Sequence, residues 1–357
     1  MDWLPGWRRP DFLKSKRGRN RVEDEKGDEA RLVDDLFPGF KMTEEDGMLA
    51  RRAYCGGTGS EREPGGVRER EREKEKEKGV PWGYMLPLLE ALMEEQRKDQ
   101  APPPPPPPPA PGMGIRILDV GCGAGKMAID LAKRLGPAGE VVGVDLSAAI
   151  LSSARAQAEM ETTANVRFLQ GDVYSLPLEA AAAAGGGGGG FDVVSTHQVL
   201  AHCREPVRAI KELMRAARKG GGGGMLCLRE GDLLTAKFFP EDAVLGECFD
   251  VIRRVHASQG GAVEAGRQLQ RWVREAGVER ENFEVSYRAW VYETAEERRE
   301  YGGHWPARCT LGMFAERAME LGVSRERLEQ YALAWKRWVE DPRGRFVMIH
   351  AEVVARV

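Results

Sequence analysis

One stretch of the chain, residues 115–125, restricts the possible fold more than any other. It begins with an almost continuous apolar run, typical of a strand that is covered on both faces of a parallel sheet, made by Ile115, Ile117, Leu118 and Val120. Glycines follow at Gly121, Gly123 and Gly125, so the backbone can turn tightly and approach a ligand closely. Apolar residues at helical spacing then predict a helix over 126–135. A glycine turn before a helix presents N–H groups to a polar or anionic ligand.

The segments that follow alternate between strand and helix patterns. We predict strands over 140–145, 165–170, 191–196 and 225–229, and helices over 148–160, capped by Ser147, and 205–218. A long helical region over 241–276, a strand over 283–290, helices near 295–301, 310–321 and 324–340, and a strand over 346–354 complete the pattern. This alternation indicates an α/β fold with a parallel sheet. The last two strands form a hairpin-like pair with helices inserted between them.

The composition of residues 1–80 differs from that of the rest of the chain, which indicates an N-terminal tail followed by a domain. Residues 1–80 are highly charged and lack sustained periodicity, so we predict that most of them are disordered, with a short helix over 32–37. A helix with one apolar face is predicted over 83–97. The Pro-rich insert 101–112 is typical of a stiff spacer, and the Ala- and Gly-rich runs 180–190 and 220–224 are typical of expanded loops. The domain is therefore expected to span residues 81–357.

Charge and hydropathy exclude several classes of protein. The formal net charge of −3 argues against a general nucleic-acid binder. No apolar run approaches the roughly 20 residues that span a bilayer. Residues 1–21 lack the apolar core of a secretory signal, so we expect a cytoplasmic protein. These residues are basic, and a mitochondrial transit peptide stays an alternative, although such peptides avoid acids and Asp2 and Asp11 are present.

The cysteines show neither paired nor regular spacing, which favours reduced thiols over a disulfide framework or a metal site. They are Cys55, Cys122, Cys203, Cys227, Cys248 and Cys309.

Acidic residues stand at or near the ends of the first three predicted strands. Asp145 ends the second strand, 24 positions after Gly121 (145 − 121), where an acid accepts hydrogen bonds from a ribose in doubly wound sheets. The G-x-G-x-G spacing departs from the G-x-G-x-x-G of dinucleotide binders, so a nicotinamide-dependent oxidoreductase is disfavoured. Asp119, just before the turn, would repel a pyrophosphate and suits a ligand with an ammonium group. Asp172, after the third strand, can accept from an adenine amino group.

These motifs resemble those of class I S-adenosylmethionine-dependent methyltransferases, and within them the ubiquinone/menaquinone-type small-molecule enzymes. The matching segments are 118–125, 144–147, 171–173, 191–194 with 197–202, 229–232, 302–306 and 349–353. The resemblance implies a three-layer α-β-α Rossmann-like fold with a mostly parallel seven-stranded sheet of order 3-2-1-4-5-7-6, strand 7 being antiparallel. It also implies that a helical insert, residues 291–342, lies on the substrate side.

The resemblance assigns the cofactor, S-adenosyl-L-methionine, to named positions. It places Asp119 near the methionine amino group, the glycine turn against its backbone, Asp145 on the ribose, and Asp172 on the adenine edge. The full implied cofactor set is Asp119, Gly121, Cys122, Gly123, Gly125, Asp145, Leu146, Gly171, Asp172, Val173 and His197. No metal is implied.

Catalysis by methyl transfer needs the two reactants in position, and a general base only where the acceptor must lose a proton. His197, His202 and His304 are candidate bases, with Glu230 a further one, while a structural role is the alternative for each histidine. Tyr301, Trp305 and Phe314 are candidates for lining an acceptor site, or for an aromatic core.

The sequence therefore predicts a methyltransferase with a small-molecule acceptor and no nucleic-acid partner. The alternative is a catalytically inactive S-adenosylmethionine-binding regulatory or scaffold protein. The acceptor, the atom methylated and the oligomeric state stay open at this point.

Overall fold

The computed structural model describes residues 83–98, 114–179, 190–219 and 223–357. The predictions for residues 1–80, the Pro-rich insert, and nearly all of the two Ala- and Gly-rich runs lie outside the described residues. The chain divides into two units, Met1–Ala110 with Lys219–Gly223, and Pro111–Arg218 with Gly224–Val357. In the first unit, a short 3-10 helix η2 (Gly83–Met85) leads into α4 (Leu86–Lys98), which confirms the helix predicted there. Met85, Leu88 and Leu89 are buried, as their helical spacing predicts.

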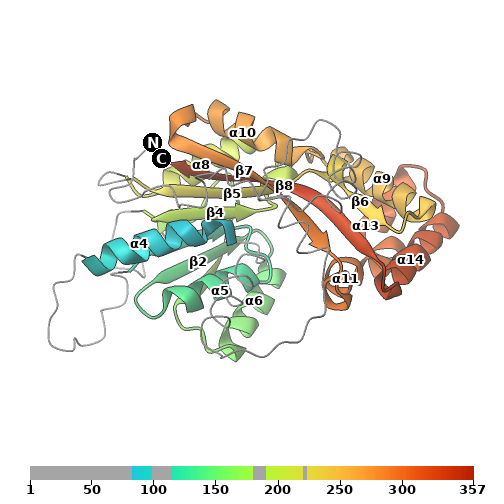
Figure 1. Cartoon of the computed structure of the whole chain (residues 1–357), viewed down its shortest axis with the longest axis horizontal. Helices are drawn as coiled ribbons and strands as arrows, with labels where there is room; N and C mark the ends of the chain where they lie inside the picture. The colour runs from blue at the N-terminus through green and yellow to red at the C-terminus, as the bar shows by residue number, and fades with distance from the viewer. Residues whose placement is uncertain (1–82, 99–113, 180–189, 220–222) are drawn as a thin grey trace, which may run out of the picture. The chain divides into compact units, whose positions relative to one another are not determined.

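The second unit is built on an eight-stranded sheet (Figure 1). Its parallel part runs in the order β3-β2-β1-β4-β5, and β8 pairs antiparallel with β5. On its other edge, β8 pairs antiparallel with β7. The strands are β1 (Arg116–Val120), β2 (Glu140–Asp145), β3 (Val166–Gln170), β4 (Val193–His197), β5 (Met225–Gly231), β7 (Phe283–Tyr292) and β8 (Arg345–Arg356). These seven strands have the expected order and the expected antiparallel last strand.

A short strand, β6 (Lys237–Phe239), is additional to the prediction. It pairs with the first residues of β8 through Phe238 and Phe346, beyond the stretch of β8 that β5 occupies. Three residues are too few to show a strand's alternation, so the sequence carries no signal for β6.

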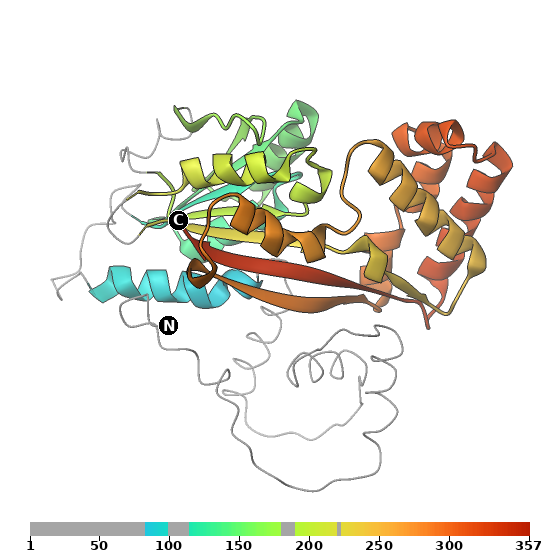
Figure 2. The same cartoon turned by 90° about the horizontal axis from the view of Figure 1, so that it is seen from above.

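Helices cover both faces of this sheet (Figures 1 and 2). α5 (Lys126–Leu135) and α6 (Ala148–Met160) pack on β2 and β3, whereas α8 (Pro206–Ala216) packs on β4, and α10 (Ala265–Glu275) on β5 and β8. Leu118, Val120 and Leu228 join the apolar core under α8 and α10. Because side chains alternate along a strand, Asp119 and Arg229 point to the opposite face.

The long helical region predicted over 241–276 is helical, with one interruption. It is two helices, α9 (Ala243–Ser258) and α10, and the chain turns between them. Gly260 has a φ of 86°, which an L side chain rarely adopts, and this glycine follows the last turn of α9. The helix predicted near 310–321 is α13 (Met313–Glu320), which begins after Gly312 at a φ of 78°. An additional short helix, α12 (Trp305–Thr310), precedes it.

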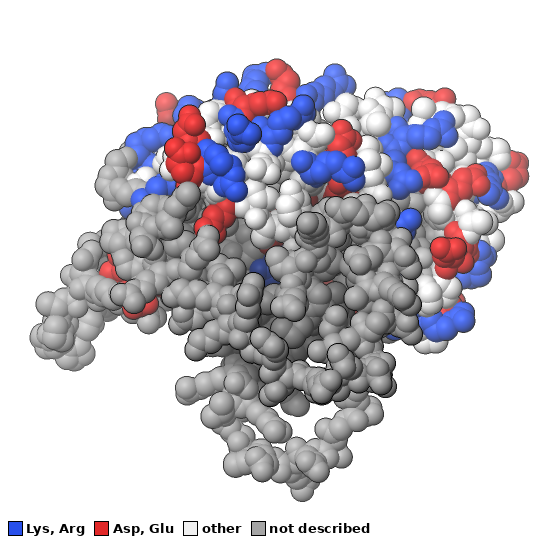
Figure 3. Space-filling view, turned by 45° about the horizontal axis from the view of Figure 1, so that its top comes forward, with Lys and Arg blue, Asp and Glu red and all other residues white. Residues whose placement is uncertain are grey.

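A second core lies within the helices that follow β5 and β7. α9, α11 (Ala295–Gly302), α12, α13 and α14 (Arg325–Glu340) surround Tyr331, Trp335, Trp338 and Phe346. These helices gather at one end of β8 in Figure 1. The chain enters them after the carboxyl end of β5, through the 3-10 helix η4 (Leu233–Thr235) and β6. No helix of the described ranges has the length and apolarity to cross a bilayer. On the face seen in Figure 3, basic and acidic side chains of the described residues are interspersed.

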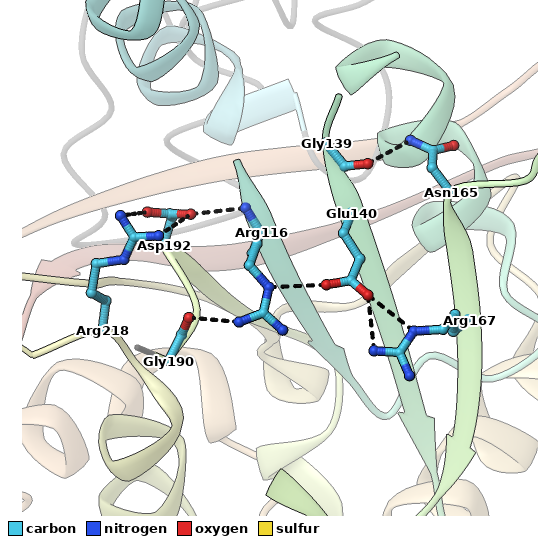
Figure 4. A network of polar contacts seen from close by, with 8 residues as sticks. All are labelled: Arg116, Gly139, Glu140, Asn165, Arg167, Gly190, Asp192 and Arg218. Carbon is cyan, nitrogen blue, oxygen red and sulfur yellow. Dashed lines mark hydrogen bonds and ion pairs between the residues drawn. The ribbon is translucent and has the colours of Figure 1, made fainter. Parts of the chain in front are cut away.

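Ion pairs join the amino ends of the parallel strands (Figure 4). Arg116 is 3% exposed and its Nε lies 2.9 Å from Glu140 Oε2, while Arg167 Nε donates to Glu140 Oε1 at 3.0 Å. The backbone N–H of Arg116 donates to Asp192 Oδ2 at 2.8 Å, and Arg218 pairs with the same carboxylate. Charge therefore concentrates where β1 to β4 begin.

Asn165 fastens the end of α5 to the start of β2. Its Nδ2 donates to the carbonyl oxygens of Ala132, Gly136 and Gly139 at 2.8, 2.8 and 3.1 Å. We expect Asn165→Ala to lower the free energy of unfolding by about 1–2 kcal/mol, because these carbonyls lose their donor. Urea titration measures this, with the exposed Gln157→Ala as control, and an Asn165→Ala variant as stable as wild type would contradict it.

Candidate functional site

The carboxyl ends of β1 and β2 hold the glycine turn in place. The N–H groups of Gly121 and Cys122 donate to Val144 O at 2.7 and 3.1 Å. Gly121, Gly123 and Gly125 have φ values of 74°, 54° and 81°, all in the left-handed region that favours glycine. Gly125 is also the N-cap of α5, so the turn leads directly into the helix.

Two of these glycines also permit close packing, and one borders open space. A Cβ at Gly121 would lie 2.2 Å from Val199 Cγ2, and one at Gly125 would lie 2.7 Å from the Phe168 ring. A Cβ at Gly123 would meet nothing within 4 Å. The tip of the turn is therefore the part that leaves room for a ligand.

Asp145 is fixed by backbone donors on two sides. Its Oδ2 accepts from the Gly123 N–H at 3.0 Å and its Oδ1 from the Ser147 N–H at 2.9 Å. A carboxylate has about four lone-pair positions, so each oxygen retains capacity to accept from a ligand hydroxyl. The neighbouring Leu146 is 68% exposed, which is unusual for a leucine beside a buried strand.

Asp119 is a buried carboxyl group with an unsatisfied oxygen. It is 1% exposed, Ser195 Oγ donates to its Oδ1 at 3.3 Å, and its Oδ2 is buried without a hydrogen-bond partner. Burial raises the pKa of Asp119 to about 7, and the charge of Asp145 adds to this, while the Ser195 hydrogen bond opposes it. A buried carboxylate oxygen of this kind is suited to a cationic donor, because burying it unpaired is costly.

The third predicted acid lies on the turn after β3. Asp172 is exposed, and its Oδ1 accepts from the Tyr174 N–H at 2.9 Å. The Gly171 N–H donates to Asp145 O at 3.0 Å, so this turn adjoins the end of β2. Val173 is half-buried and packs on the main core. Cys122 is half-buried, and burial raises the pKa of its thiol, which makes it a poor nucleophile.

The three candidate histidines have three different surroundings. His197, half-buried at the end of β4, lies one register position beyond the pair of Val120 and Thr196. His202, at the end of the 3-10 helix η3 (Leu200–His202), is exposed and its ring meets that of His256 at 4.8 Å. His304 is exposed at the N-cap of α12, with its ring 5.6 Å from that of Trp305. Among them, only His197 stands beside the glycine turn.

Glu230 supports a turn and is not placed as a base. The fully buried carboxylate accepts from the N–H groups of Val199, Leu200 and Ala201 at 3.0, 2.7 and 3.2 Å. It thereby holds the start of η3, which carries Val199 against Gly121.

The aromatic candidates belong to the helical core, which is the alternative that the sequence left open for them. The Tyr301 ring stacks on Phe346 with centroids 4.2 Å apart, Trp305 stacks on Trp335 at 5.4 Å, and Phe314 meets Trp305 edge-on at 5.5 Å. All three pack against the buried cluster of these helices.

Sequence reasoning missed a second polar group beside His197. Arg229 and His350 are 1% and 0% exposed, and the Arg229 guanidinium lies 3.7 Å from the centroid of the Trp290 ring. The rings of Trp290 and His350 stack 5.0 Å apart, and that of Trp290 is 5.8 Å from His197. The available signal was the presence of Arg229, Glu230, His350 and Glu352 inside otherwise apolar strands.

Among the described residues, no group of three or more His, Cys, Asp or Glu side chains is arranged to hold a metal ion. Five of the cysteines are described, and all are free thiols.

Comparison with known proteins gives a consistent result. A family model described as a methyltransferase domain matches residues 112–277. A Schizosaccharomyces pombe protein named as an uncharacterized methyltransferase is 33% identical over 256 residues, 67% of this chain and 83% of that protein. A demethylmenaquinone methyltransferase of Lactococcus lactis is 36% identical over 108 residues, 30% of this chain and 40% of that protein.

A solved structure is also similar. The phosphoethanolamine N-methyltransferase 2 of Haemonchus contortus, in complex with S-adenosyl-L-methionine, gives a TM-score of 0.39 at 17% identity, and the match covers 70% of this chain and 50% of that chain. The chain thus matches most of the fission-yeast protein, but only two fifths of the lactococcal enzyme.

Proposed function

The chain belongs to the S-adenosylmethionine-dependent methyltransferases, and we propose that it binds this cofactor along β1, β2 and β3 and methylates a small molecule. The observation that carries the proposal is the buried, unpartnered Oδ2 of Asp119 beside the glycine turn. A methionine ammonium group would supply the cationic donor that this oxygen lacks.

The other predicted positions are compatible with the rest of the cofactor. Asp145 has remaining lone pairs for ribose hydroxyls, and the exposed Leu146 offers an apolar surface to the adenine ring. The open space at Gly123 leaves room for the amino-acid part. Gly171, Asp172 and Val173 adjoin Asp145 through the Gly171 hydrogen bond, so we assign them to the adenine side.

The cofactor supplies an electrophilic methyl group on a sulfonium sulfur. The contribution of this chain is then to bind, orient and shield the two reactants. His197 borders the place where they meet. Burial, with the charge of Arg229, lowers the pKa of His197 to about 3, so the ring is neutral at physiological pH and holds a proton poorly. We therefore assign His197 to positioning the acceptor.

We expect Asp145→Ala to weaken binding of S-adenosylmethionine by about 1–2 kcal/mol, because the ribose loses its acceptor. Isothermal titration calorimetry measures this directly. Asp250→Ala, an exposed acid on α9, is the control. Unchanged affinity of Asp145→Ala would remove this residue from the site.

The affinity for the cofactor should depend on pH. Below the Asp119 pKa of about 7, this carboxyl carries a proton that must leave before it can pair with an ammonium group. The dissociation constant should therefore rise as pH falls below this value, approaching roughly tenfold per pH unit. Calorimetry on either side of neutrality tests this, and a flat profile in wild type would show that Asp119 does not pair with the cofactor.

A small acceptor is supported by two observations. The lactococcal relative, which matches 30% of this chain, is named as a demethylmenaquinone methyltransferase. On the face seen in Figure 3, basic and acidic side chains of the described residues are interspersed. A nucleic-acid-binding surface instead has its basic side chains gathered in a patch or stripe. A catalytically inactive S-adenosylmethionine-binding scaffold is the alternative function.

Incubation of the full chain with methyl-labelled cofactor and a metabolite extract, followed by mass spectrometry, separates these functions. A labelled small product supports the proposal. Label only in protein or nucleic acid would contradict the small acceptor. Cofactor binding without any labelled product would favour the scaffold. The Asp119→Asn variant, which should bind the cofactor weakly, gives the amount of label that appears without this enzyme's activity.

A further inference from the structure

A row of polar side chains continues from Asp119 across the sheet. Asp119 pairs in register with Ser195, and two residues later on β4 His197 pairs with Arg229 of β5, which pairs with Glu352 of β8. Paired residues, and residues two apart on one strand, share a face of the sheet. His350 and Trp290 occupy the same face, since His350 is two residues from Glu352, and Trp290 pairs with Met348.

The contacts of His350 determine where its ring proton lies. Arg229 Nε donates to His350 Nδ1 at 3.1 Å. A guanidinium has no acceptor, so His350 Nδ1 must be the unprotonated nitrogen. Burial and the nearby charge of Arg229 lower the pKa of His350 well below its ordinary value, so the ring is neutral. Its single proton is therefore on Nε2.

This Nε2–H group is a buried donor with nothing to donate to. His350 is 0% exposed and its Nε2 has no hydrogen-bond partner, and neither has the buried Nε2 of His197, whose ring is 6.5 Å away. A buried donor left unsatisfied costs about 1–3 kcal/mol. A glycine opposite it in the register, Gly231, lets the ring pack closely against β5, because a Cβ there would lie 2.9 Å from Met348 Cε and 3.2 Å from His350 Nε2.

We propose that His350 Nε2, with Arg229 beside it and His197 on the cofactor side, binds an anionic oxygen of the methyl acceptor. The acceptor is then an acidic compound that carries an ionised hydroxyl group or a carboxylate. The donor and the guanidinium supply the hydrogen bond and the positive charge that such an oxygen needs. This inference rests on the proposed function, since it concerns the second substrate of the same site.

The neighbouring contacts hold Arg229 and His350 in fixed positions. Glu352 accepts from Arg288 Nε at 3.0 Å and from Ser286 Oγ at 3.2 Å, and lies 3.6 Å from Arg229 Nε. These contacts fix Arg229, which in turn orients the His350 ring, and the stacked Trp290 limits its rotation. The recognising donor is therefore held rigidly before a ligand arrives.

The test uses the full chain saturated with S-adenosylhomocysteine and two matched pairs of probes. Nitrophenolate is compared with its methyl ether, nitroanisole, and benzoate with methyl benzoate, by calorimetry at a pH where both acids are ionised. We expect the anion of at least one pair to bind roughly tenfold more tightly than its neutral partner. The pair that shows the larger preference for its anion tells whether the acceptor oxygen belongs to an ionised hydroxyl group or to a carboxylate.

Two variants locate the effect. His350→Phe removes the Nε2–H and keeps a ring against Trp290, and Gly231→Ala places a methyl group against Nε2 and Met348. Both should lose the preference for the anion by about tenfold and retain affinity for S-adenosylhomocysteine within roughly twofold. Gly246→Ala, on α9 with nothing within 4 Å of an added Cβ, is the matched glycine control.

Several results would overturn the inference. They are equal binding of both members of each pair, an unchanged preference in His350→Phe and Gly231→Ala, and a crystal structure in which a bound probe makes no contact with His350 Nε2. Should His350→Phe fail to fold, movement of the His350 ring N–H signal in nitrogen NMR on adding nitrophenolate or benzoate replaces it, and an unmoved signal counts against the site. Absence of S-adenosylhomocysteine binding in wild type would instead defeat the proposed function.

Discussion

Asp119→Asn is expected to weaken binding of S-adenosylmethionine by about 3–4 kcal/mol, roughly 150- to 900-fold, because the cofactor ammonium is left beside a neutral amide in a buried place. The same substitution should stabilise the protein without ligand. Burial holds the Asp119 pKa at about 7 in the folded protein, against an ordinary value of 3.8. The folded state therefore keeps a proton that the unfolded chain releases.

The sign of the stability effect follows from this difference. Between about pH 4 and 7 the native state binds more protons than the unfolded state, so the free energy of unfolding falls as pH rises. Asparagine has no ionisable group, so the variant does not lose stability in this way as pH rises. Asp119→Asn should therefore melt several degrees above wild type at pH 8, and the difference should vanish near pH 4.

Calorimetry and thermal melts of the same samples check both halves of this expectation. Asp250→Asn, an exposed acid on α9, is the matched control and should change neither quantity. A variant with lower stability and unchanged cofactor affinity would show that Asp119 has a purely structural role.

Glu230→Ala is expected to lower the free energy of unfolding by about 3 kcal/mol. Three N–H groups at the start of η3 lose their acceptor, at roughly 1–3 kcal/mol each. Removing the carboxyl also relieves the cost of its burial, which raises the pKa of Glu230 to about 7 although the three hydrogen bonds lower it. The lost hydrogen bonds exceed this relief, so the net effect is destabilising.

Urea titration of Glu230→Ala and Glu230→Gln shows whether Glu230 stabilises the start of η3 or acts as a catalytic base. Both variants should be destabilised, since the glutamine NH₂ faces N–H donors. Cofactor affinity should fall only slightly at a temperature where the variants are folded. A Glu230→Gln variant with wild-type stability and no methyl transfer would identify Glu230 as a base after all.

The first strands of the sheet, the glycine turn and the helices beside them were largely predictable, because each of these features has a local cause. The helix over 126–135 has the predicted bounds, since Gly125 caps it on one side and Gly136 on the other. Ser147 caps α6 as expected, by accepting from the Ile150 N–H. Strand-end acids reach one edge in any parallel sheet, so Asp119 and Asp145 were placed by topology alone.

The polar side chains of β5 and β8 were less predictable, because they depend on contacts between distant segments. Arg229 and His350 are 121 residues apart in the chain and meet only through the pairing of β5 with β8. Glu230 resembled a catalytic base until the three N–H groups around it were known. The turn between α9 and α10 contains Gly260 at a φ of 86°, a backbone conformation that hydrophobic periodicity does not report.

The strand β8 has a consequence for how this protein can diversify. Its last residues pair with β5 and its first residues with β6, while β7 accompanies it over nearly its whole length. The helices α11 to α14 enter and leave the sheet between β7 and β8, so their sequence and length can change while this register stays the same. A change in this helical segment would therefore leave the pairing of β8 with β5, β6 and β7 as it is.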